Sequence, residues 1–241
     1  MARNNHIKAV CFDMDNTLYS YDEAHAAANR SLLDYGNSRF GKSDEEFLAD
    51  IARAQELLVE RVGFYNASSH NRILRFQCLM ELLGEDVGGA LEMYHAYWDV
   101  FLENLHPEPG IYELLDGLKK AGVRIGLGTN MMAYMQYEKM KRLQMSKYFD
   151  RIMSSEEACT EKPKPEFYQF CVKKLECEPS ECIFIGDSRK NDAEGASNAG
   201  LYGLWYSRYE KKASDISDLP EIRDYRECLT EQGIQLGIHL I

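Results

Sequence analysis

The chain has 241 residues, of which 45% are hydrophobic and 28% charged, so it can build one large domain or two smaller ones around a sizeable core. Its 28 Lys and Arg face 39 Asp and Glu, and the net charge of -11 argues against nucleic-acid polymers as partners, because these are bound by clustered basic residues. The sequence shows no secretory signal, no run of the ~20 apolar residues that span a membrane, and no Cys-x-x-Cys pair, which predicts a cytoplasmic protein without a membrane partner.

The first predicted element is a buried strand, an apolar run at residues 8–12, and two acids follow it at once in Asp13-Met14-Asp15-Asn16-Thr17. In an open parallel sheet, ligands bind just beyond the carboxyl ends of the strands. One carboxylate at that place can attack phosphorus and carry a phosphoryl group, while a second can transfer protons. Taken alone, the motif fits a polar turn equally well, since Asp, Asn and Thr favour loops and helix caps.

A helical block without a convincing strand comes next. Apolar residues recur at helical spacing over residues 22–34, 43–62, 68–83 and about 86–104. Ser43 and Glu46 have the spacing of a capping box, and glycines fall at the breaks. A linker at residues 106–110 closes the block. Because the block comes directly after the paired aspartates, we expect it to lie as a lid over the carboxyl edge of the sheet.

After residue 110, predicted helices and strands alternate. Helices are expected at residues 111–121, 132–143, 165–175, 190–199 and 219–230, and strands at 123–127, 149–153, 182–185 and 202–205. This alternation implies βαβ units around a parallel sheet. The predicted fold class is therefore α/β, with a doubly wound, Rossmann-like parallel-sheet core and an inserted helical cap domain. The core would comprise residues 1–18 and 107–241, and the cap residues 19–106.

Three more polar signals follow apolar strands of this pattern. They are Thr129 with Asn130, Lys162 with Lys164 in a Pro-rich turn, and Asp187 with Asp192. Hydroxyl, amide and ammonium groups can bind phosphate oxygens, and carboxylates beside Asp13 can hold Mg²⁺, which prefers hard oxygen ligands. Each signal alone also fits a helix cap or an exposed turn, and residue type does not choose between the two lysines. Together they would meet at one rim of a parallel sheet, which points to a site.

In this combination the chain resembles the haloacid dehalogenase-like hydrolase superfamily, in particular its phosphatases with a helical cap after the first motif, from about residue 7 to 230. The resemblance implies that Asp13 is the nucleophile and Asp15 the general acid and base. Dehalogenating members lack the second acid, so the presence of Asp15 favours phosphate transfer over carbon–halogen cleavage.

The resemblance also implies a set of ligand-binding residues. Mg²⁺ would be held by Asp13, the backbone carbonyl of Asp15, and Asp187. Thr129, Asn130 and Lys162, preferred over Lys164 by the resemblance, would bind the phosphoryl group, and Asp192 would support the metal waters or the lysine.

These roles predict Mg²⁺-dependent hydrolysis of a small phosphorylated metabolite through an aspartyl-phosphate intermediate. The spacing from Thr129 through Gln136 and Lys139 to Lys162 looks most like nucleoside-monophosphate and acylneuraminate-phosphate phosphatases, which implies a nucleotide or sugar-phosphate substrate. Two alternatives stay open. A phosphomutase of the β-phosphoglucomutase type would keep the same motifs, and a non-catalytic regulatory module would keep the metal site without turnover.

The predicted cap contains candidate residues for substrate choice. Asn66, His70, Arg72 and Arg75 can contact a leaving group, and Phe64 or Tyr65 can stack on a base. For any single one of them, a solvated helix start is the simpler interpretation. Tyr19 and Tyr21 flank the expected hinge and are candidates for the entrance. The sequence does not predict the oligomeric state.

Overall fold

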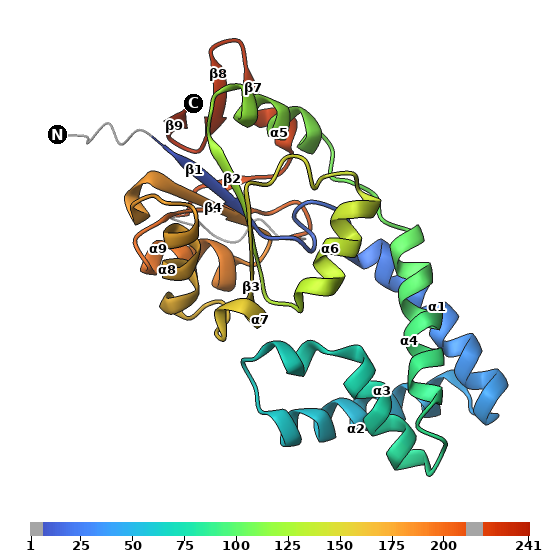
Figure 1. Ribbon diagram of the computed structural model, residues 1–241. Helices are drawn as coiled ribbons and strands as arrows, with labels where there is room; N and C mark the ends of the chain where they lie inside the picture. Colours follow the sequence, from blue (N-terminus) through green and yellow to red (C-terminus); the bar gives the residue numbers. More distant parts are fainter. Residues whose placement is uncertain (1–6, 211–218) are drawn as a thin grey trace.

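The computed structural model describes residues 7–210 and 219–241, and in these parts of the chain the central feature is a parallel sheet of six strands (Figure 1). The strands are β1 (Ala9–Phe12), β2 (Arg124–Thr129), β3 (Arg151–Ser154), β4 (Cys182–Gly186), β5 (Tyr202–Tyr206) and β6 (Glu221–Ile222). Their order across the sheet is β3-β2-β1-β4-β5-β6, so β1 lies between β2 and β4. This topology confirms the predicted α/β class with a parallel sheet.

Helices cover both faces of the sheet, and the alternation of side chains along β1 shows why (Figure 1). Val10 and Phe12 belong to the same apolar cluster as Leu114 of α5, whereas Ala9 and Cys11 belong to the cluster that contains Phe167 of α8. A strand that buries both faces needs apolar residues at every position, and β1 is buried throughout. The helices that flank the sheet are α5 (Ile111–Lys120), α6 (Ala133–Arg142), α7 (Ser155–Ala158), α8 (Pro165–Lys174) and α9 (Gly195–Asn198). A π-helical turn at Arg189–Glu194 precedes α9.

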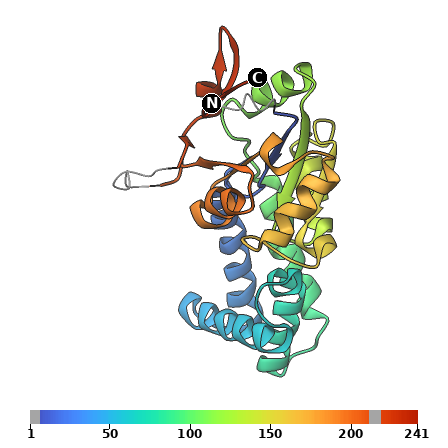
Figure 2. The same ribbon diagram turned by 90° about the vertical axis from the view of Figure 1, so that its left-hand side faces the viewer.

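Four long helices lie between β1 and α5 in the sequence and project from one end of the sheet (Figures 1 and 2). They are α1 (Tyr21–Phe40), α2 (Asp44–Val62), α3 (Arg72–Leu83) and α4 (Gly89–Glu103), with a 3₁₀ turn at Ala67–His70. We call residues 21–103 the helical segment. Helix α1 packs along α4, and α2 packs along α3, which also contacts α4. The predicted capping box is present, since the Glu46 N–H donates to Ser43 Oγ and the Ser43 N–H to Glu46 Oε2.

Helix α1 is longer than the sequence pattern predicts. It contains a glycine, Gly36, at the point where it packs closely against α2. The expected end at residue 34 precedes Gly36, but the helix continues to Phe40 and ends at Gly41 with φ of 65°. A Cβ at Gly36 would lie 2.2 Å from Phe47 Cε1. The glycine therefore lets α1 and α2 approach each other and does not end the helix.

The predicted last helix at residues 219–230 is wrong. Its described part holds β6, a 3₁₀ turn at Tyr225–Cys228 and the start of a small antiparallel sheet of β7 (Leu229–Thr230), β8 (Gly233–Leu236) and β9 (His239–Leu240). Pro220 lacks an N–H, and the Asp224 side chain accepts from the Arg226 N–H, which turns the chain locally. Ile222 instead extends the parallel sheet beside Tyr206. Tertiary pairing overrides the helical spacing here.

All seven cysteines are free thiols. No helix in the described parts of the chain is both long enough and apolar enough to cross a membrane. A cytoplasmic location stays a prediction.

Candidate active site

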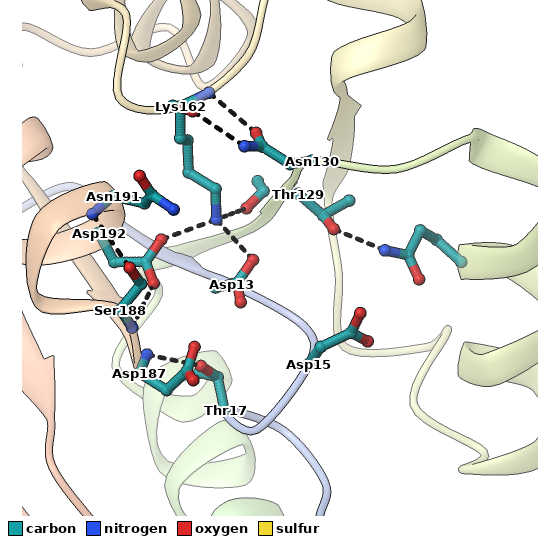
Figure 3. A network of polar contacts seen from close by, with 12 residues as sticks. Asp13, Asp15, Thr17, Thr129, Asn130, Lys162, Asp187, Ser188, Asn191 and Asp192 are labelled. Atoms are coloured by element: carbon teal, nitrogen blue, oxygen red, sulfur yellow. Dashed lines mark hydrogen bonds and ion pairs between the residues drawn. The ribbon is translucent and has the colours of Figure 1, made fainter. Parts of the chain in front are cut away.

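The carboxyl ends of β1, β2 and β4 meet the loop that follows α7, and together they form one polar cavity of about 490 Å³ (Figure 3). Its lining residues are Asp13, Asp15, Asn16, Thr129, Asn130, Lys162, Asp187, Ser188, Asn191 and Asp192. All seven candidates that the sequence predicts in the core line this cavity. The adjacency of β1 to both β2 and β4 explains the convergence, because the polar residues follow the ends of these neighbouring strands.

Lys162 joins two carboxylates at the floor of the cavity. Its Nζ lies 2.6 Å from Asp13 Oδ1 and 2.7 Å from Asp192 Oδ1, and it also donates to the Gly128 carbonyl at 3.1 Å. Burial alone would lower the pKa of the ammonium, but the charges of Asp13 and Asp192 outweigh it and raise the pKa. Lys162 is therefore a fixed positive charge beside the predicted nucleophile.

Asp192 reaches this position because residue 186 is a glycine. A Cβ at Gly186 would lie 2.3 Å from Asp192 Cγ. Both carboxylate oxygens of Asp192 are used, since Oδ1 pairs with Lys162 and Oδ2 accepts from the Ser188 N–H at 2.9 Å. The side chain thus holds the lysine and the loop after β4 together.

Asp187 brings a carboxylate to the same place without a positive partner. No hydrogen bond or ion pair to this carboxylate is found among the residues that the structure describes, while its backbone N–H donates to Thr17 Oγ1 at 3.0 Å. Burial, followed by repulsion from Asp13 and Asp192, raises the pKa of Asp187 to about 8. Burial also raises the pKa of Asp13 to about 7 in spite of the nearby Lys162.

These carboxylates fit a divalent cation. One oxygen each of Asp13, Asp187 and Asp192 lies within 4.8 Å of the others. Because Asp192 is committed to Lys162 and Ser188, Asp13 and Asp187 are the two acids that have oxygens left for a metal. Hard oxygen donors of this kind, one or two carboxylates with water completing the shell, suit Mg²⁺. A cation there would also relieve the repulsion that raises both pKa values.

Asp15 points away from Lys162 (Figure 3). Its carboxylate instead contacts a second buried lysine, Lys139. Its Oδ1 accepts from Tyr19 Oη at 2.5 Å and from Lys139 Nζ at 2.6 Å. Lys139 is fully buried on α6, and its Nζ lies within 6 Å of the ring centroids of Tyr19, Trp98 and Phe101. Tyr19, expected near the entrance, is instead fully buried beneath Asp15. The Oδ2 of Asp15 accepts no hydrogen bond from the described residues.

Thr129 and Asn130 follow β2 and have different surroundings. Thr129 Oγ1 accepts from Gln136 Nε2 at 2.5 Å, so its hydroxyl hydrogen can donate into the cavity. The Asn130 side chain forms a reciprocal pair with the backbone of Lys162, accepting from its N–H at 2.8 Å and donating to its carbonyl at 2.9 Å. Asn130 therefore positions Lys162, and phosphate binding by its side chain stays a prediction.

None of the four cap candidates lines this cavity. Asn66 is committed to its own turn, since Nδ2 donates to the Val62 and Gly63 carbonyls and Oδ1 accepts from the Ser68 N–H. The prediction that Asn66 contacts substrate is therefore not supported by its bonds. His70 Nε2 lies 3.1 Å from Glu161 Oε2, next to Lys162, and so ties the helical segment to the core.

The other two candidates, Arg72 and Arg75, line a separate pocket together with His25 and Tyr97. The rings of Phe64 and Tyr65 are largely exposed, at 74% and 57%, and neither lines the cavity. Base stacking by these two rings is therefore not supported in this structure.

Several residues of the site were not singled out from the sequence. Lys139 and Gln136 appeared there only as part of a family pattern, although a polar pair among the buried positions of α6 is a usable signal. Thr17 supports the Asp187 loop, and Trp205 Nε1 donates to the Asp187 carbonyl at 2.8 Å. Trp205 gave no signal, because its contact depends on the pairing of β5 with β4.

Comparison with known families and proteins gives a consistent result. A family model described as haloacid dehalogenase-like hydrolase matches residues 7–200. The chain is 33% identical to a ribulose-1,5-bisphosphate 5-phosphatase of Halopiger xanaduensis, over 90% of this chain and 89% of that one. It is 32% identical to a glyceraldehyde 3-phosphate phosphatase of Methanopyrus kandleri, over 92% and 96% of the two chains. With the human N-acylneuraminate-9-phosphatase it shares 27% identity, over 84% and 83%.

Solved structures agree with the fold. A 2-haloacid dehalogenase from Pseudomonas syringae has a TM-score of 0.74 at 26% identity, covering 90% of this chain and 94% of that one. A phosphatase from Thermococcus onnurineus has a TM-score of 0.68 at 22% identity, covering 92% and 95%.

Proposed function

Because the chain belongs to the haloacid dehalogenase-like hydrolase family, we propose that it is a phosphatase that hydrolyses a small sugar phosphate through an aspartyl-phosphate intermediate. The observation that supports this most strongly is the pairing of Lys162 Nζ with Asp13 Oδ1 beside the unpaired carboxylate of Asp187. A nucleophilic carboxylate, a fixed cation and a second acid in one cavity are what phosphoryl transfer requires.

In the first step Asp13 acts as the nucleophile. Lys162 pairs with its Oδ1, and one carboxylate oxygen attacks phosphorus while the other would face the cation. The new O–P bond forms as the bond from phosphorus to the leaving oxygen breaks. Lys162 and the Thr129 hydroxyl would stabilise the phosphoryl oxygens as negative charge shifts onto them.

Asp15 would provide the proton for the leaving oxygen. Since Tyr19 and Lys139 both donate to its Oδ1, the free Oδ2 is the atom that carries the proton. In the second step the same Oδ2 takes a proton from water, which attacks phosphorus and breaks the bond to Asp13. Inorganic phosphate leaves, and both carboxyl groups return to their starting states.

Asp13 and Asp187 would hold Mg²⁺ through their side chains, and Asp15 through its backbone carbonyl, as the family resemblance implies. When bound, the ion supplies positive charge that offsets the repulsion between the anionic nucleophile and the dianionic ester. The helical segment would act as the cap, hinged near Asn16, whose Oδ1 accepts from the Tyr21 N–H at 2.9 Å.

A sugar phosphate is favoured over a nucleoside monophosphate. Phe64 and Tyr65, the residues expected to stack on a base, do not line the cavity. Curated relatives at 33% and 32% identity are named for a sugar bisphosphate and a triose phosphate.

The test is release of inorganic phosphate from a panel of ~100 phosphomonoesters, ranked by kcat/KM, with and without EDTA. We expect sugar phosphates to rank highest and Asp13→Asn to remove turnover while the protein stays folded. Removal of a nucleophile typically lowers kcat by roughly 10⁴-fold or more. Substantial turnover in pure Asp13→Asn would exclude the covalent route. Isomerisation of a sugar bisphosphate without net phosphate release would identify a phosphomutase instead.

A further inference from the structure

The helical segment contains a second pocket, of about 360 Å³, which shares no lining residue with the active-site cavity. Its wall is formed by residues of all four helices: His25, Asn29, Leu32, Leu33, Leu48, Ile51, Arg72, Arg75, Phe76 and Tyr97. The lining is mainly apolar, but two guanidinium groups open into it.

Among the described residues, the hydrogen-bond partners of Arg72 are two tyrosine hydroxyls, which carry no negative charge. One of its terminal nitrogens, Nη2, donates to Tyr21 Oη at 3.0 Å and to Tyr97 Oη at 2.8 Å. The guanidinium carbon also lies 4.1 Å from the centroid of the Tyr97 ring. Ring faces and hydroxyls hold this side chain in place without neutralising it.

Arg75 lies one turn further along α3, has no such support, and is half-buried. Its Nε is buried without a hydrogen-bond partner, and no carboxylate in the described parts of the chain forms an ion pair with it. Burial and the neighbouring charge of Arg72 lower the pKa of Arg75 to about 10. Buried charges are normally paired, and neither of these two adjacent guanidinium groups forms an ion pair with the described residues, so the pair with its unused donor suits an anionic group.

The pocket is connected to the active site through Tyr21. The Tyr21 N–H donates to Asn16, which lines the active-site cavity, while its hydroxyl accepts from Arg72. Beyond Tyr21, the same stripe of α1 carries His25 and Asn29 into the pocket. At 1.5 Å per residue, His25 and Asn29 lie roughly 6–12 Å along α1 from Tyr21. Tyr21 therefore lies between Arg72 on the side of the pocket and Asn16 on the side of the active-site cavity.

We propose that Arg72 and Arg75 bind a second anionic group, a phosphate or a carboxylate, carried by the leaving group of the substrate. This inference rests on the proposed phosphatase function and narrows its substrate class to sugar phosphates with a negative charge at the far end. Arg75 supplies the unused donors, and Arg72 is held by the two tyrosines at the side of the pocket toward the hinge.

The wild-type enzyme tests this with two matched pairs of substrates. One pair is a pentose bisphosphate and its pentose monophosphate, and the other is a hexonate phosphate and its hexitol phosphate. We expect kcat/KM to be at least about tenfold higher for a doubly anionic member than for its partner, since contacts between fixed charges are worth several-fold or more in affinity. A preference in the first pair alone identifies phosphate as the second anion, and one in the second pair alone identifies carboxylate.

The variant Arg75→Met should remove this preference, because kcat/KM falls more for the doubly anionic member of each pair than for its singly charged partner. Arg53→Met, an exposed position on α2, is the matched control and should retain the preference. If Arg75→Met lowers all four values equally, Arg75 has only a structural role and the inference is wrong. Unfolding midpoints show whether Arg75→Met folds. If it does not fold, the comparison of substrate pairs on the wild-type enzyme still tests the proposal.

The two proposals can fail separately. Phosphate release from both members of each pair at equal kcat/KM would overturn the second-anion site and leave the phosphatase intact. No release from any ester, with Mg²⁺ present, would overturn the phosphatase itself.

Discussion

Lys139 Nζ lies 2.6 Å from Asp15 Oδ1, although the lysine side chain is fully buried and comes from a helix 124 residues further along the chain. The pair joins the loop after β1 to α6. Aromatic rings surround the ammonium, and Asp15 is its carboxylate partner, with about a third of the acid's side chain exposed. The ion pair therefore fixes which oxygen of Asp15 is free for proton transfer.

Replacing this lysine tests its positioning role. Lys139→Met keeps the length of the side chain but releases Asp15 Oδ1, so we expect kcat to fall by up to about 100-fold while KM changes little. Steady-state kinetics measure both values. Lys141→Met, an exposed position on the same helix, should behave like the wild type. A raised KM with an unchanged kcat would show that Lys139 serves substrate binding.

The choice between the two lysines of the Pro-rich turn leads to a second prediction. Lys162 Nζ contacts Asp13, whereas Lys164 Nζ lies 5.5 Å from the centroid of the exposed Tyr65 ring. Lys162→Met removes a preorganised charge and should lower kcat by about 10²–10³-fold, which corresponds to roughly 3–4 kcal/mol in the barrier. Lys164→Met should stay within about twofold. Comparable losses in both variants would contradict the assignment.

Metal binding can be measured without turnover. Mg²⁺ at 100 times its Kd should stabilise the folded protein by about 2.7 kcal/mol, which raises Tm by roughly 5–10 °C. Asp187→Asn should lose most of this increase, because it removes the carboxylate that has no protein partner. Excess EDTA should stop phosphate release, and added Mg²⁺ should restore it. An equal Tm increase in Asp187→Asn would place the ion elsewhere.

His25 should make the helical segment sensitive to acid. Burial, followed by the charge of Arg72, lowers the pKa of His25 below its usual 6.5. His25 Nδ1 lies 2.6 Å from Tyr97 Oη, and Nε2 lies 3.0 Å from Asn29 Nδ2, an arrangement that suits the neutral ring. A lowered folded-state pKa means that stability is complete above pH 6.5 and declines as the pH falls below it.

The expected result is that the free energy of unfolding falls more steeply between pH 7 and pH 5 in the wild type than in His25→Gln. Urea unfolding at a series of pH values measures the difference. Parallel curves for the two proteins would show that protonation of His25 carries no penalty. His95, exposed on α4, provides the control variant His95→Gln, which should follow the wild type.

Much of the core could be predicted because its signals are local. The apolar run before Asp13 and the apolar run before Asp187 both predict buried strands, and both strands are present. The order of strands and helices then implies a parallel sheet, and a parallel sheet brings the polar residues after neighbouring strands to one rim. The helix boundaries depend on tertiary contacts as well: α1 continues past the predicted end at residue 34 to Phe40, and Gly36 within it makes room for Phe47.

The sequence by itself determined the fold class and the set of core residues that meet in the cavity, since hydrophobic periodicity and strand order act over a few residues at a time. Only the tertiary structure decided that Lys162 rather than Lys164 reaches Asp13, that Lys139 holds Asp15, and that Asn66 is committed to its own turn. It also showed that Arg75 Nε has no hydrogen-bond partner among the residues described. Such contacts depend on side chains that are far apart in the sequence. A charged group without an ion-pair partner can be recognised only when the residues packed around it are known.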